Sequence, residues 1–277
     1  MAALNAPLTE AEVRAACCLL PRSTHPGTFG VCAAALRVLA RTNSVGLQML
    51  TTMCNSVLHH CDPALLTALL VPIPKCNPAH TVQQLRPLQI ASVWYRLLMR
   101  VFVQRTPARL FSVSQHGFRR DHSTLTAAVE VQCACDVAPS PLHLIKVDIV
   151  KAYDHVAWPP LWEAMSTIGL SGPLYSLLQA ATTQATVQLA TDTLPRSFTP
   201  TRGLKQGCPY SPTLFNLLLS GLDSYLATVA PSSGVALPHR RARSVEYADD
   251  LLLLARTPAE AQLLLTATAQ YLAHFGL

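Results

Sequence analysis

The sequence predicts an α+β fold in which an antiparallel sheet packs on helices. Apolar residues recur with helical spacing through much of the 277 residues. Residues 142–148 alternate in part between apolar and polar, as a strand does, and residues 245–254 are typical of a two-stranded hairpin. Half of the residues are hydrophobic, which is enough for the core of one large domain or two small ones.

The first half of the chain is expected to be mostly helical. Pro72 and Pro74 exclude helix from an extended segment in this half, because proline lacks an N–H group and restricts the residue before it. In chain order, the expected elements are a helix over 9–20, helical structure over 31–60, the extended segment 65–73, a loop over 81–87, helices over 92–104 and 122–135, and the strand 142–148.

The second half alternates between helices and hairpins. Gly169 is expected to end one helix and Pro173 to begin the next, as these residue types commonly do. In chain order, the expected elements are helices over 157–169 and 173–181, a polar hairpin over 185–198, an apolar helix over 209–230, the hairpin 245–254 with Ala248 and Asp249 at its tip, and an amphipathic helix over 258–275.

Composition narrows the class of protein. The formal net charge is +6, a mild basic balance that is compatible with a polyanionic partner. The nine cysteines are an odd number without C-x-x-C spacing, which favours small core residues in a reducing compartment. We find no secretory signal, and no stretch reaches the roughly 18 uninterrupted apolar residues that cross a bilayer. We therefore expect an intracellular protein of the nucleus or cytoplasm, neither secreted nor membrane-bound.

Aspartates beside aliphatic runs are the most informative feature. Asp249 and Asp250 directly precede four leucines, and Asp148 ends the strand 142–148. Carboxylates in such surroundings are costly unless a cation neutralises them. Alone, Asp148 is more typical of a turn or helix cap, and aspartate at a hairpin tip often serves the backbone. If the hairpin lies beside the strand, Asp148 and Asp249 meet at one edge, where two Mg²⁺ ions could be held about 3.5–4 Å apart, with Mn²⁺ as a substitute.

The stretch 202–212 predicts a defined loop. It contains two glycines, two prolines and two basic residues, and it opens a helix whose free N–H groups could meet an anion or a nucleotide. A plain interdomain turn is the alternative, and the stretch is not a P-loop. Lys75, Arg86 and Arg119 are each more typical of surface charges. All three are explained together only if their loops fold over a triphosphate.

Together these stretches resemble the reverse transcriptases of non-LTR (LINE-like) retrotransposons. The resemblance covers about residues 65–277. The motifs, in the family's order, are Leu-Val-Pro-Ile-Pro-Lys at 70–75, Leu-Arg-Pro-Leu at 85–88, Gln-His-Gly-Phe-Arg at 115–119, Asp-Ile-Val-Lys-Ala-Tyr-Asp at 148–154, Gly-Leu-Lys-Gln-Gly-Cys-Pro-Tyr-Ser-Pro at 203–212 and Tyr-Ala-Asp-Asp at 247–250. The first three resemble fingers motifs and the last three resemble palm motifs.

The resemblance implies a right-hand polymerase with fingers and a ferredoxin-like palm. It assigns 1–110 to an N-terminal extension and fingers, 111–158 to the first part of the palm, 159–200 to a fingers-side insertion and 201–277 to the second part of the palm. The thumb is expected to be absent, as are the endonuclease domain and zinc knuckle of relatives. Tyr210 stands where the family usually has an aliphatic residue, and we expect it to be tolerated.

The resemblance also implies roles for individual residues. Asp148 and Asp249 correspond to the magnesium ligands, the Ile149 carbonyl faces the metal, and Asp250 lies beside them. Tyr153 matches the steric gate that excludes a ribose 2′-hydroxyl, although its chemistry also suits an ordinary core aromatic residue. The implied nucleotide- and template-binding residues are Lys75, Arg86, Arg119, Gln206 and Gly207.

The implied function is RNA-directed DNA polymerisation, with an RNA template, a DNA primer and deoxynucleoside triphosphates as partners. The oligomeric state is left open. One alternative is a catalytically inactive remnant that still binds nucleic acid, since the thumb is missing and the charge is modest. A group II intron or retron relative is the other, although Cys208 to Pro212 favours the LINE-like type.

Overall fold

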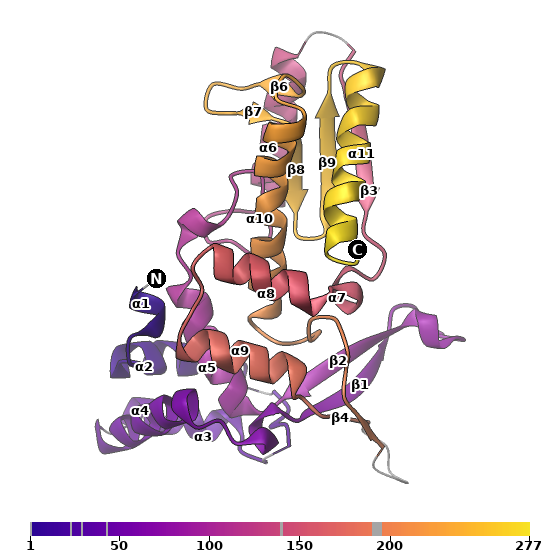
Figure 1. The fold of residues 1–277 in the computed structure, drawn as a ribbon. Coiled ribbons are helices and arrows are strands. Elements are labelled where there is room, and N and C mark those ends of the chain that lie inside the picture. The colour runs from indigo at the N-terminus through magenta and orange to yellow at the C-terminus, as the bar shows by residue number, and fades with distance from the viewer. Residues whose placement is uncertain (1, 23, 29, 43, 139–140, 190–195) are drawn as a thin grey trace. The chain divides into compact units, whose positions relative to one another are not determined.

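The computed structural model describes residues 2–22, 24–28, 30–42, 44–138, 141–189 and 196–277 (Figure 1). The chain folds into two compact units, and each is built from two separate segments. Unit 1 comprises the residues up to Thr106 together with Gly169–Ser211. Unit 2 comprises Pro107–Ile168 and Pro212–Leu277.

Unit 1 is rich in helices. Its helices are α1 (Ala2–Asn5), α2 (Glu10–Leu19), α3 (Ala33–Thr42), α4 (Ser44–His59), α5 (Val93–Arg105) and α9 (Pro173–Thr183), with short 3₁₀ turns η1 (Pro63–Leu66) and η2 (Val82–Gln84). A capping box formed by Thr9 and Glu12 starts α2, and the Ser92 hydroxyl caps α5 by accepting from the Tyr95 N–H. The helical periodicity predicted over 31–60 thus corresponds to two helices.

The sheet of unit 1 has the strand order β2-β1-β4-β5. Its strands are β1 (Ala68–Pro74), β2 (Leu85–Ala91), β4 (Val187–Leu189) and β5 (Ser197–Phe198). The paired ends β4 and β5 agree with the hairpin predicted over 185–198, of which residues 190–195 lie outside the described part. The loop predicted over 81–87 is wrong in its last residues, because β2 begins at Leu85. Pro87 stands opposite Pro72 in the register. Because both residues lack a backbone N–H, placing them opposite each other leaves neither with an expected hydrogen bond unmade at this pair.

Unit 2 is built on the sheet β3-β9-β8. Its strands are β3 (His143–Asp148), β8 (Ser244–Tyr247) and β9 (Asp250–Ala255), and both pairings are antiparallel. The register runs from His143 opposite Ala255 to Asp148 opposite Asp250. The predicted strand and the predicted hairpin, with Ala248 and Asp249 at its tip, are both confirmed. A small pair, β6 (Val235–Ala236) and β7 (Arg241–Ala242), was not predicted, because two-residue strands show no period.

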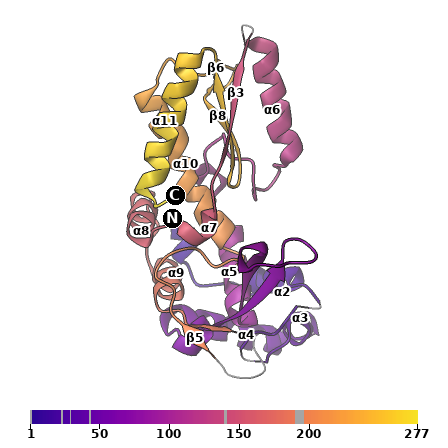
Figure 2. The ribbon, with the colours of Figure 1, turned by 90° about the vertical axis from the view of Figure 1, so that its right-hand side faces the viewer.

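Helices cover both faces of this sheet. The helices of unit 2 are α6 (Thr124–Val137), α7 (Ala152–His155), α8 (Trp158–Thr167), α10 (Ser211–Val229) and α11 (Pro258–His274), with the 3₁₀ turn η3 (Ala108–Leu110). Figure 2 shows α6 on one side of the strands and α10 and α11 on the other. The predicted α+β class is therefore observed, and α7 is the one helix of unit 2 among the described residues that the periodicity did not indicate. None of the helices in the described ranges is long and apolar enough to cross a membrane.

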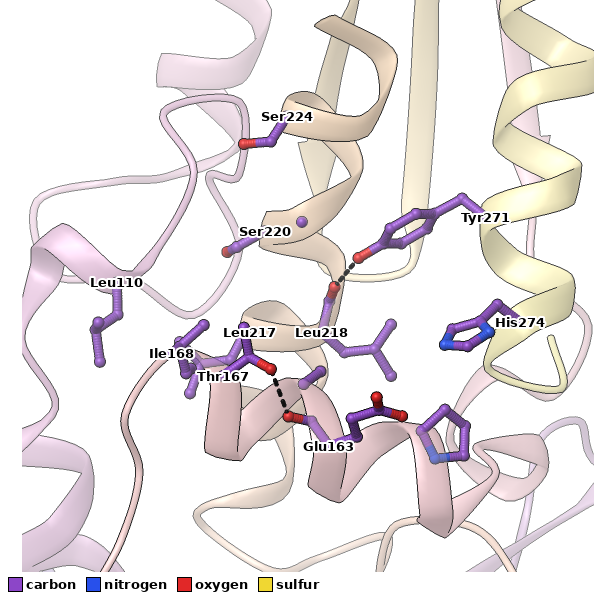
Figure 3. Close-up of a pocket in the computed structure, with 13 residues that line it drawn as sticks. Leu110, Glu163, Thr167, Ile168, Leu217, Leu218, Ser220, Ser224, Tyr271 and His274 are labelled. Carbon is purple, nitrogen blue, oxygen red and sulfur yellow. Dashed lines mark hydrogen bonds between the residues drawn. The ribbon is translucent and has the colours of Figure 1, made fainter. Parts of the chain in front are cut away.

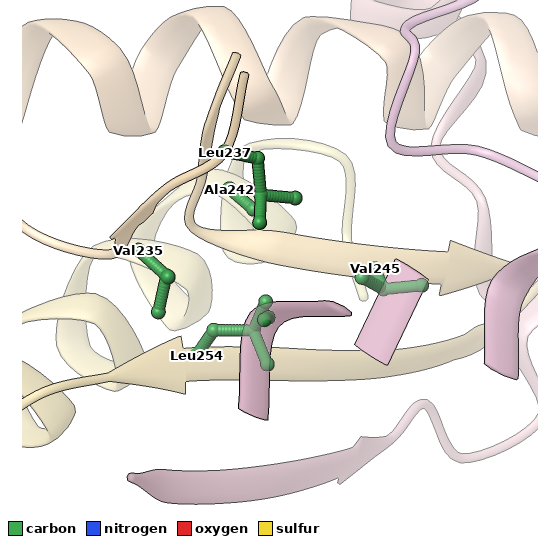
Figure 4. Close-up of a cluster of buried hydrophobic side chains, with 6 residues drawn as sticks. Val235, Leu237, Ala242, Val245 and Leu254 are labelled. Atoms are coloured by element: carbon green, nitrogen blue, oxygen red, sulfur yellow. The ribbon is translucent and has the colours of Figure 1, made fainter. Parts of the chain in front are cut away.

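A cluster of buried side chains joins α6 to the sheet (Figure 4). Its fully or nearly buried members are Ala134, Val235, Leu237, Ala242, Val245 and Leu254. Alternate residues of β9 point to opposite faces, so Leu254 and Leu252 meet α6 while Leu251 and Leu253 point to the other face. The run of leucines after Asp250 thus anchors the sheet on both sides.

Replacing Leu254 by alanine should lower the free energy of unfolding by about 2–5 kcal/mol, because a fully buried leucine leaves a cavity. Urea unfolding measures the loss. Leu263→Ala is the control, since the Leu263 side chain is 45% exposed on α11 and its loss should change stability by about 0.5 kcal/mol or less. Equal losses for the two variants would contradict the assignment of this core.

Candidate functional site

Three aspartates lie at one end of the sheet of unit 2. Asp148, the last residue of β3, stands directly opposite Asp250, the first residue of β9. Opposite residues of an antiparallel pair point to the same face, with Cβ atoms roughly 4.5–5.5 Å apart. Asp249 precedes Asp250 in the two-residue loop between β8 and β9. Asp148 and Asp250, which are more than 100 residues apart in the sequence, are thus neighbours through strand pairing.

Lys146 is the basic residue on this face of the sheet. It lies two residues before Asp148 on β3, and its Nζ is 3.3 Å from an Asp250 carboxylate oxygen. The two side chains are 71% and 61% exposed, so the pair contributes little to stability. Within the described ranges, neither Asp148 nor Asp249 has a basic partner at ion-pair distance. These two carboxylates therefore keep oxygens that a divalent cation could take.

The side chains themselves are not drawn together around one point. Among the described residues, no three His, Cys, Asp or Glu side chains are arranged to hold a metal ion. Carboxylates repel one another, and Asp250 turns towards Lys146. The donor chemistry nevertheless fits, because carboxylate and carbonyl oxygens are the ligands that Mg²⁺ prefers. The strand pairing sets Asp148 opposite Asp250, and Asp249 directly precedes Asp250 in the chain.

Tyr153 packs on α10 and is affected by the charge of Asp249. Its ring, on α7, stacks on the Phe215 ring of α10, with centroids 5.0 Å apart and an angle of 18° between the planes. Burial, and then the negative charge of nearby Asp249, raises the pKa of the Tyr153 phenol. The aromatic ring is thus held from behind by α10 and stays neutral next to the hairpin tip.

Arg119 is also in unit 2, but its visible contacts are within its own loop. Its Nη1 donates to the carbonyl oxygens of Ser112 and Gln115, both at 2.7 Å. The guanidinium carbon lies 5.4 Å from the centroid of the Phe111 ring. These contacts give Arg119 a part in shaping the loop that precedes α6.

The other expected binding residues belong to unit 1. Lys75 and Arg86 are exposed near the far end of the β1–β2 hairpin. Arg86 stands opposite Ile73, two residues before Lys75, and the Lys75 N–H donates to the Gln84 carbonyl at 2.7 Å. The hairpin therefore presents both basic side chains at the same end.

The loop with Gln206 and Gly207 lies against β2 of the same unit. The Gln89 N–H donates to the Gln206 carbonyl at 2.7 Å. Gly207 has a φ of +103°, and a Cβ added there would be 2.8 Å from Leu88 Cδ1. A side chain at this position is excluded by both conformation and space. Unit 1 thus holds Gln206 and Gly207 next to the strand that carries Arg86.

Two buried side chains anchor this loop. Lys205 Nζ donates to the Leu66 carbonyl at 3.1 Å and lies 5.3 Å from the centroid of the Tyr95 ring. Burial lowers the pKa of Lys205 to about 8, because the charged amine loses its water. Tyr210, which stands where the family usually has an aliphatic residue, is fully buried, and its hydroxyl lies 3.1 Å from the Thr106 hydroxyl.

Unit 2 also contains a pocket of about 420 Å³ (Figure 3). Most of its lining residues belong to α8, α10 and α11. Among them, the Tyr271 hydroxyl donates a hydrogen bond to the Leu218 carbonyl at 2.6 Å. Its lining, which comes entirely from described residues, includes none of the predicted site residues.

Comparison with known families decides the class of protein. The sequence profile of the family described as reverse transcriptase (RNA-dependent DNA polymerase) matches residues 73–277. The chain belongs to this family. The match begins within β1, so it includes the motif stretches from 85–88 to 247–250.

Curated relatives place this reverse transcriptase among non-LTR elements, as predicted. The chain is 26% identical over 275 residues to the Pol polyprotein of the type-2 retrotransposable element R2DM of Drosophila melanogaster, which covers 98% of this chain and 25% of the relative. It is 29% identical over 190 residues to the R2 polyprotein of Popillia japonica, covering 66% and 26%. It is 27% identical over 221 residues to the R2 polyprotein of Nasonia vitripennis, and this alignment covers 76% of this chain and 21% of the relative. The chain thus spans about a quarter of the length of these relatives.

Solved structures support the fold of this reverse transcriptase. A telomerase from Candida Tropicalis, in complex with a TWJ fragment of telomeric RNA, aligns with a TM-score of 0.55 at 10% identity, over 77% of this chain and 40% of that chain. An apo telomerase from the same organism, truncated from its C-terminal domain, aligns with a TM-score of 0.55 at 11% identity. This alignment covers 88% of this chain and 58% of that chain. At this identity the likeness concerns the fold alone, and it confirms the predicted α+β polymerase class.

Several residues that contact the predicted site residues had no individual role in the sequence analysis, although Gln115 belongs to the motif at 115–119. Phe215 supports Tyr153, and Gln115 contacts the hairpin tip. Glu246 is fully buried one residue before Tyr247, where an acidic residue inside an apolar strand was a signal that could have been noticed. The contact of Gln115 with Ala248 gave no such signal, because the two residues lie 133 positions apart in the sequence.

Lys205 should make stability depend on pH in a definite direction. The folded chain releases the Lys205 proton near pH 8, whereas the unfolded chain keeps it to about 10.5. Between these values the unfolded state binds more protons, so the free energy of unfolding should rise with pH. Urea unfolding at pH 8 and pH 10 should show a larger rise for the parent than for Lys205→Met. An equal rise in both proteins would contradict a buried, charged Lys205.

Proposed function

We propose that this chain is the catalytic core of an RNA-directed DNA polymerase. It would transfer the nucleotidyl group of a deoxynucleoside triphosphate to a DNA 3′-hydroxyl on an RNA template, with pyrophosphate as the leaving group. One observation carries the proposal: strand pairing sets Asp148 opposite Asp250 and next to Asp249, in a chain that belongs to the reverse transcriptase family. The mild positive charge of +6 is favourable for polyanionic partners.

Asp148 and Asp249 would hold divalent cations, with the Ile149 carbonyl as a further ligand and Asp250 beside them. Mg²⁺ in two positions is the proposed cofactor, and Mn²⁺ could replace it. When bound, such ions activate the attacking hydroxyl and screen the charge that grows on the phosphorus. The part of the protein is to supply carboxylates from two paired strands, so that the donors are already neighbours before a cation arrives.

Each of the two units would contribute its own residues to the proposed reaction. Unit 2, with the carboxylates and its sheet backed by α10 and α11, corresponds to the palm, and unit 1 to the fingers. Lys75 and Arg86 would bind the triphosphate and template, and Gln206 with Gly207 would lie against the incoming nucleotide and its template base. Arg119 would act less directly, because its Nη1 already binds two loop carbonyls.

Tyr153 would select deoxynucleotides. A ring beneath the sugar leaves no room for a 2′-hydroxyl, and the stacking on Phe215 keeps the Tyr153 ring from moving aside. Burial, and after it the negative charge of Asp249, raises the pKa of the Tyr153 phenol, which agrees with a neutral ring in this position. Selection would rest on the shape of the ring and not on the hydroxyl group.

Asp249→Asn should lower primer extension on an RNA template by about 100-fold or more, the scale on which the loss of one charge-stabilising group slows a reaction. Asp136→Asn is the matched control, because Asp136 is exposed on α6 of the same unit, and it should keep parental activity. A parent that binds RNA but incorporates no nucleotide would select the inactive, nucleic-acid-binding remnant instead. Equal activity of Asp249→Asn and the parent would remove Asp249 from the proposed site.

Tyr153→Val should reduce the preference for deoxynucleotides over ribonucleotides by about 10–100-fold, because a steric contact of this kind is worth about 1–3 kcal/mol. Tyr153→Phe should keep the preference, since the ring remains. The measurement is kcat/KM for a matched pair of nucleotides that differ only in the 2′-hydroxyl. A loss of preference in Tyr153→Phe, or none in Tyr153→Val, would contradict the gate.

A further inference from the structure

We propose that Gln115 is a positioning residue that holds the Ala248 peptide and thereby orients Asp249 for binding a divalent cation. The inference rests on the proposed function, because it concerns the same carboxylates. Gln115 belongs to a motif that the resemblance counts among the fingers. In the structure this motif lies in unit 2, against the hairpin that carries Asp249.

The side chain of Gln115 binds both polar groups of Ala248. Its Oε1 accepts from the Ala248 N–H at 2.8 Å, and its Nε2 donates to the Ala248 carbonyl at 3.2 Å. The same Oε1 accepts from the Gly117 N–H at 2.8 Å. Gln115 is fully buried, so water does not compete for these bonds. One side chain thus closes the loop between β8 and β9.

The loop needs such a partner for two reasons. Ala248 has a φ of 55°, a left-handed conformation that costs a residue with a Cβ about 1 kcal/mol or more. The residue is also 4% exposed, and its N–H and carbonyl would be buried without partners if Gln115 were absent. Each such orphan costs about 1–3 kcal/mol. Without Gln115 the loop is therefore expected to take another conformation, and Asp249 moves with it.

Gln115 is itself fixed by the backbone around it. Its segment runs parallel to β8, with a bridge to Glu246, whose N–H donates to the Ser114 carbonyl and whose carbonyl accepts from the His116 N–H, both at 2.8 Å. Gly117 approaches so closely that a Cβ there would be 2.4 Å from the Ala248 nitrogen. The loop is thus held by a rigid surface.

Asn216 extends this support to α10. Its Nδ2 donates to the Gly117 carbonyl, and it follows Phe215, which supports Tyr153. The hairpin tip and the Tyr153 ring therefore share one helix as their base. Groups that reach metal ligands through one hydrogen-bonded neighbour commonly change metal affinity or activity by about 10–100-fold when lost.

The decisive variant is Gln115→Met, which keeps the length of the side chain and removes its hydrogen bonds. Ser114→Ala is the matched control. Ser114 is the adjacent, fully buried residue, and its hydroxyl binds the Glu246 carboxylate at 3.1 Å without touching Ala248. Both variants lose buried hydrogen bonds of the same network, but only one loses contact with the loop.

Two readouts separate positioning from stability. Mn²⁺ affinity of the full 277-residue chain, by electron paramagnetic resonance, should fall about 10–100-fold in Gln115→Met and less than about twofold in Ser114→Ala. In primer extension, Gln115→Met should lower kcat by a similar factor with little change in KM for the nucleotide. Thermal unfolding confirms that both variants are folded.

A second variant covers the case in which Gln115→Met does not fold. Gln115→Glu keeps the acceptor for the Ala248 and Gly117 N–H groups and loses the Nε2 donor, which serves the Ala248 carbonyl and, at 3.5 Å, the Glu246 carboxylate. It should weaken Mn²⁺ binding in the same direction by a smaller factor. Parental Mn²⁺ affinity in whichever of the two variants folds, or an equal loss in Ser114→Ala, would overturn the proposal.

The Mn²⁺ titration needs no turnover. If the parent binds Mn²⁺ but incorporates no nucleotide, the proposed polymerase fails while the role of Gln115 is still decided. A parent that binds no Mn²⁺ overturns both.

Discussion

The antiparallel pairing of β3 with β9 is the interaction on which the proposed site depends. It sets Asp148 opposite Asp250, and a shift of one residue would turn Asp148 to the other face of the sheet. The leucines of β9 fix the register, because Leu251 and Leu253 are buried on one face and Leu254 joins the α6 cluster on the other. Apolar packing along the strands thus decides where the carboxylates at their ends meet.

The second constraint is the shape of the tip between β8 and β9. A left-handed, buried Ala248 is held by a glutamine from a distant segment, and that segment is in turn held by β8 and Asn216. Tyr153 is held from the same helix through Phe215. The carboxylate end of the sheet is therefore surrounded by residues whose contacts are internal and rigid, while the carboxylates of Asp148 and Asp250 face outwards. That contrast suits a surface that accepts cations and a large substrate.

Much of this was predictable from the sequence, and the exceptions have physical reasons. The alternation over 142–148 and the tetrapeptide 247–250 predicted the strand and the hairpin tip, because a half-buried strand and a tight turn are local signals. The strand β2 was not predicted, because residues 81–87 were assigned to a loop, and its pairing with β1 is a contact between separate segments that the local pattern does not show. The contact of Gln115 with Ala248 joins segments that are distant in the sequence, so no local pattern specifies it.

A double-mutant cycle on Asp148 and Asp249 tests most directly whether the two strand ends form one metal site. Mn²⁺ affinity is measured for the parent, Asp148→Asn, Asp249→Asn and the double variant, each shown to be folded. If both carboxylates hold the same ions, the double variant should lose much less affinity than the sum of the single losses, with a coupling of about 0.5–3 kcal/mol. Strictly additive losses, or a parent without measurable Mn²⁺ binding, would contradict the account.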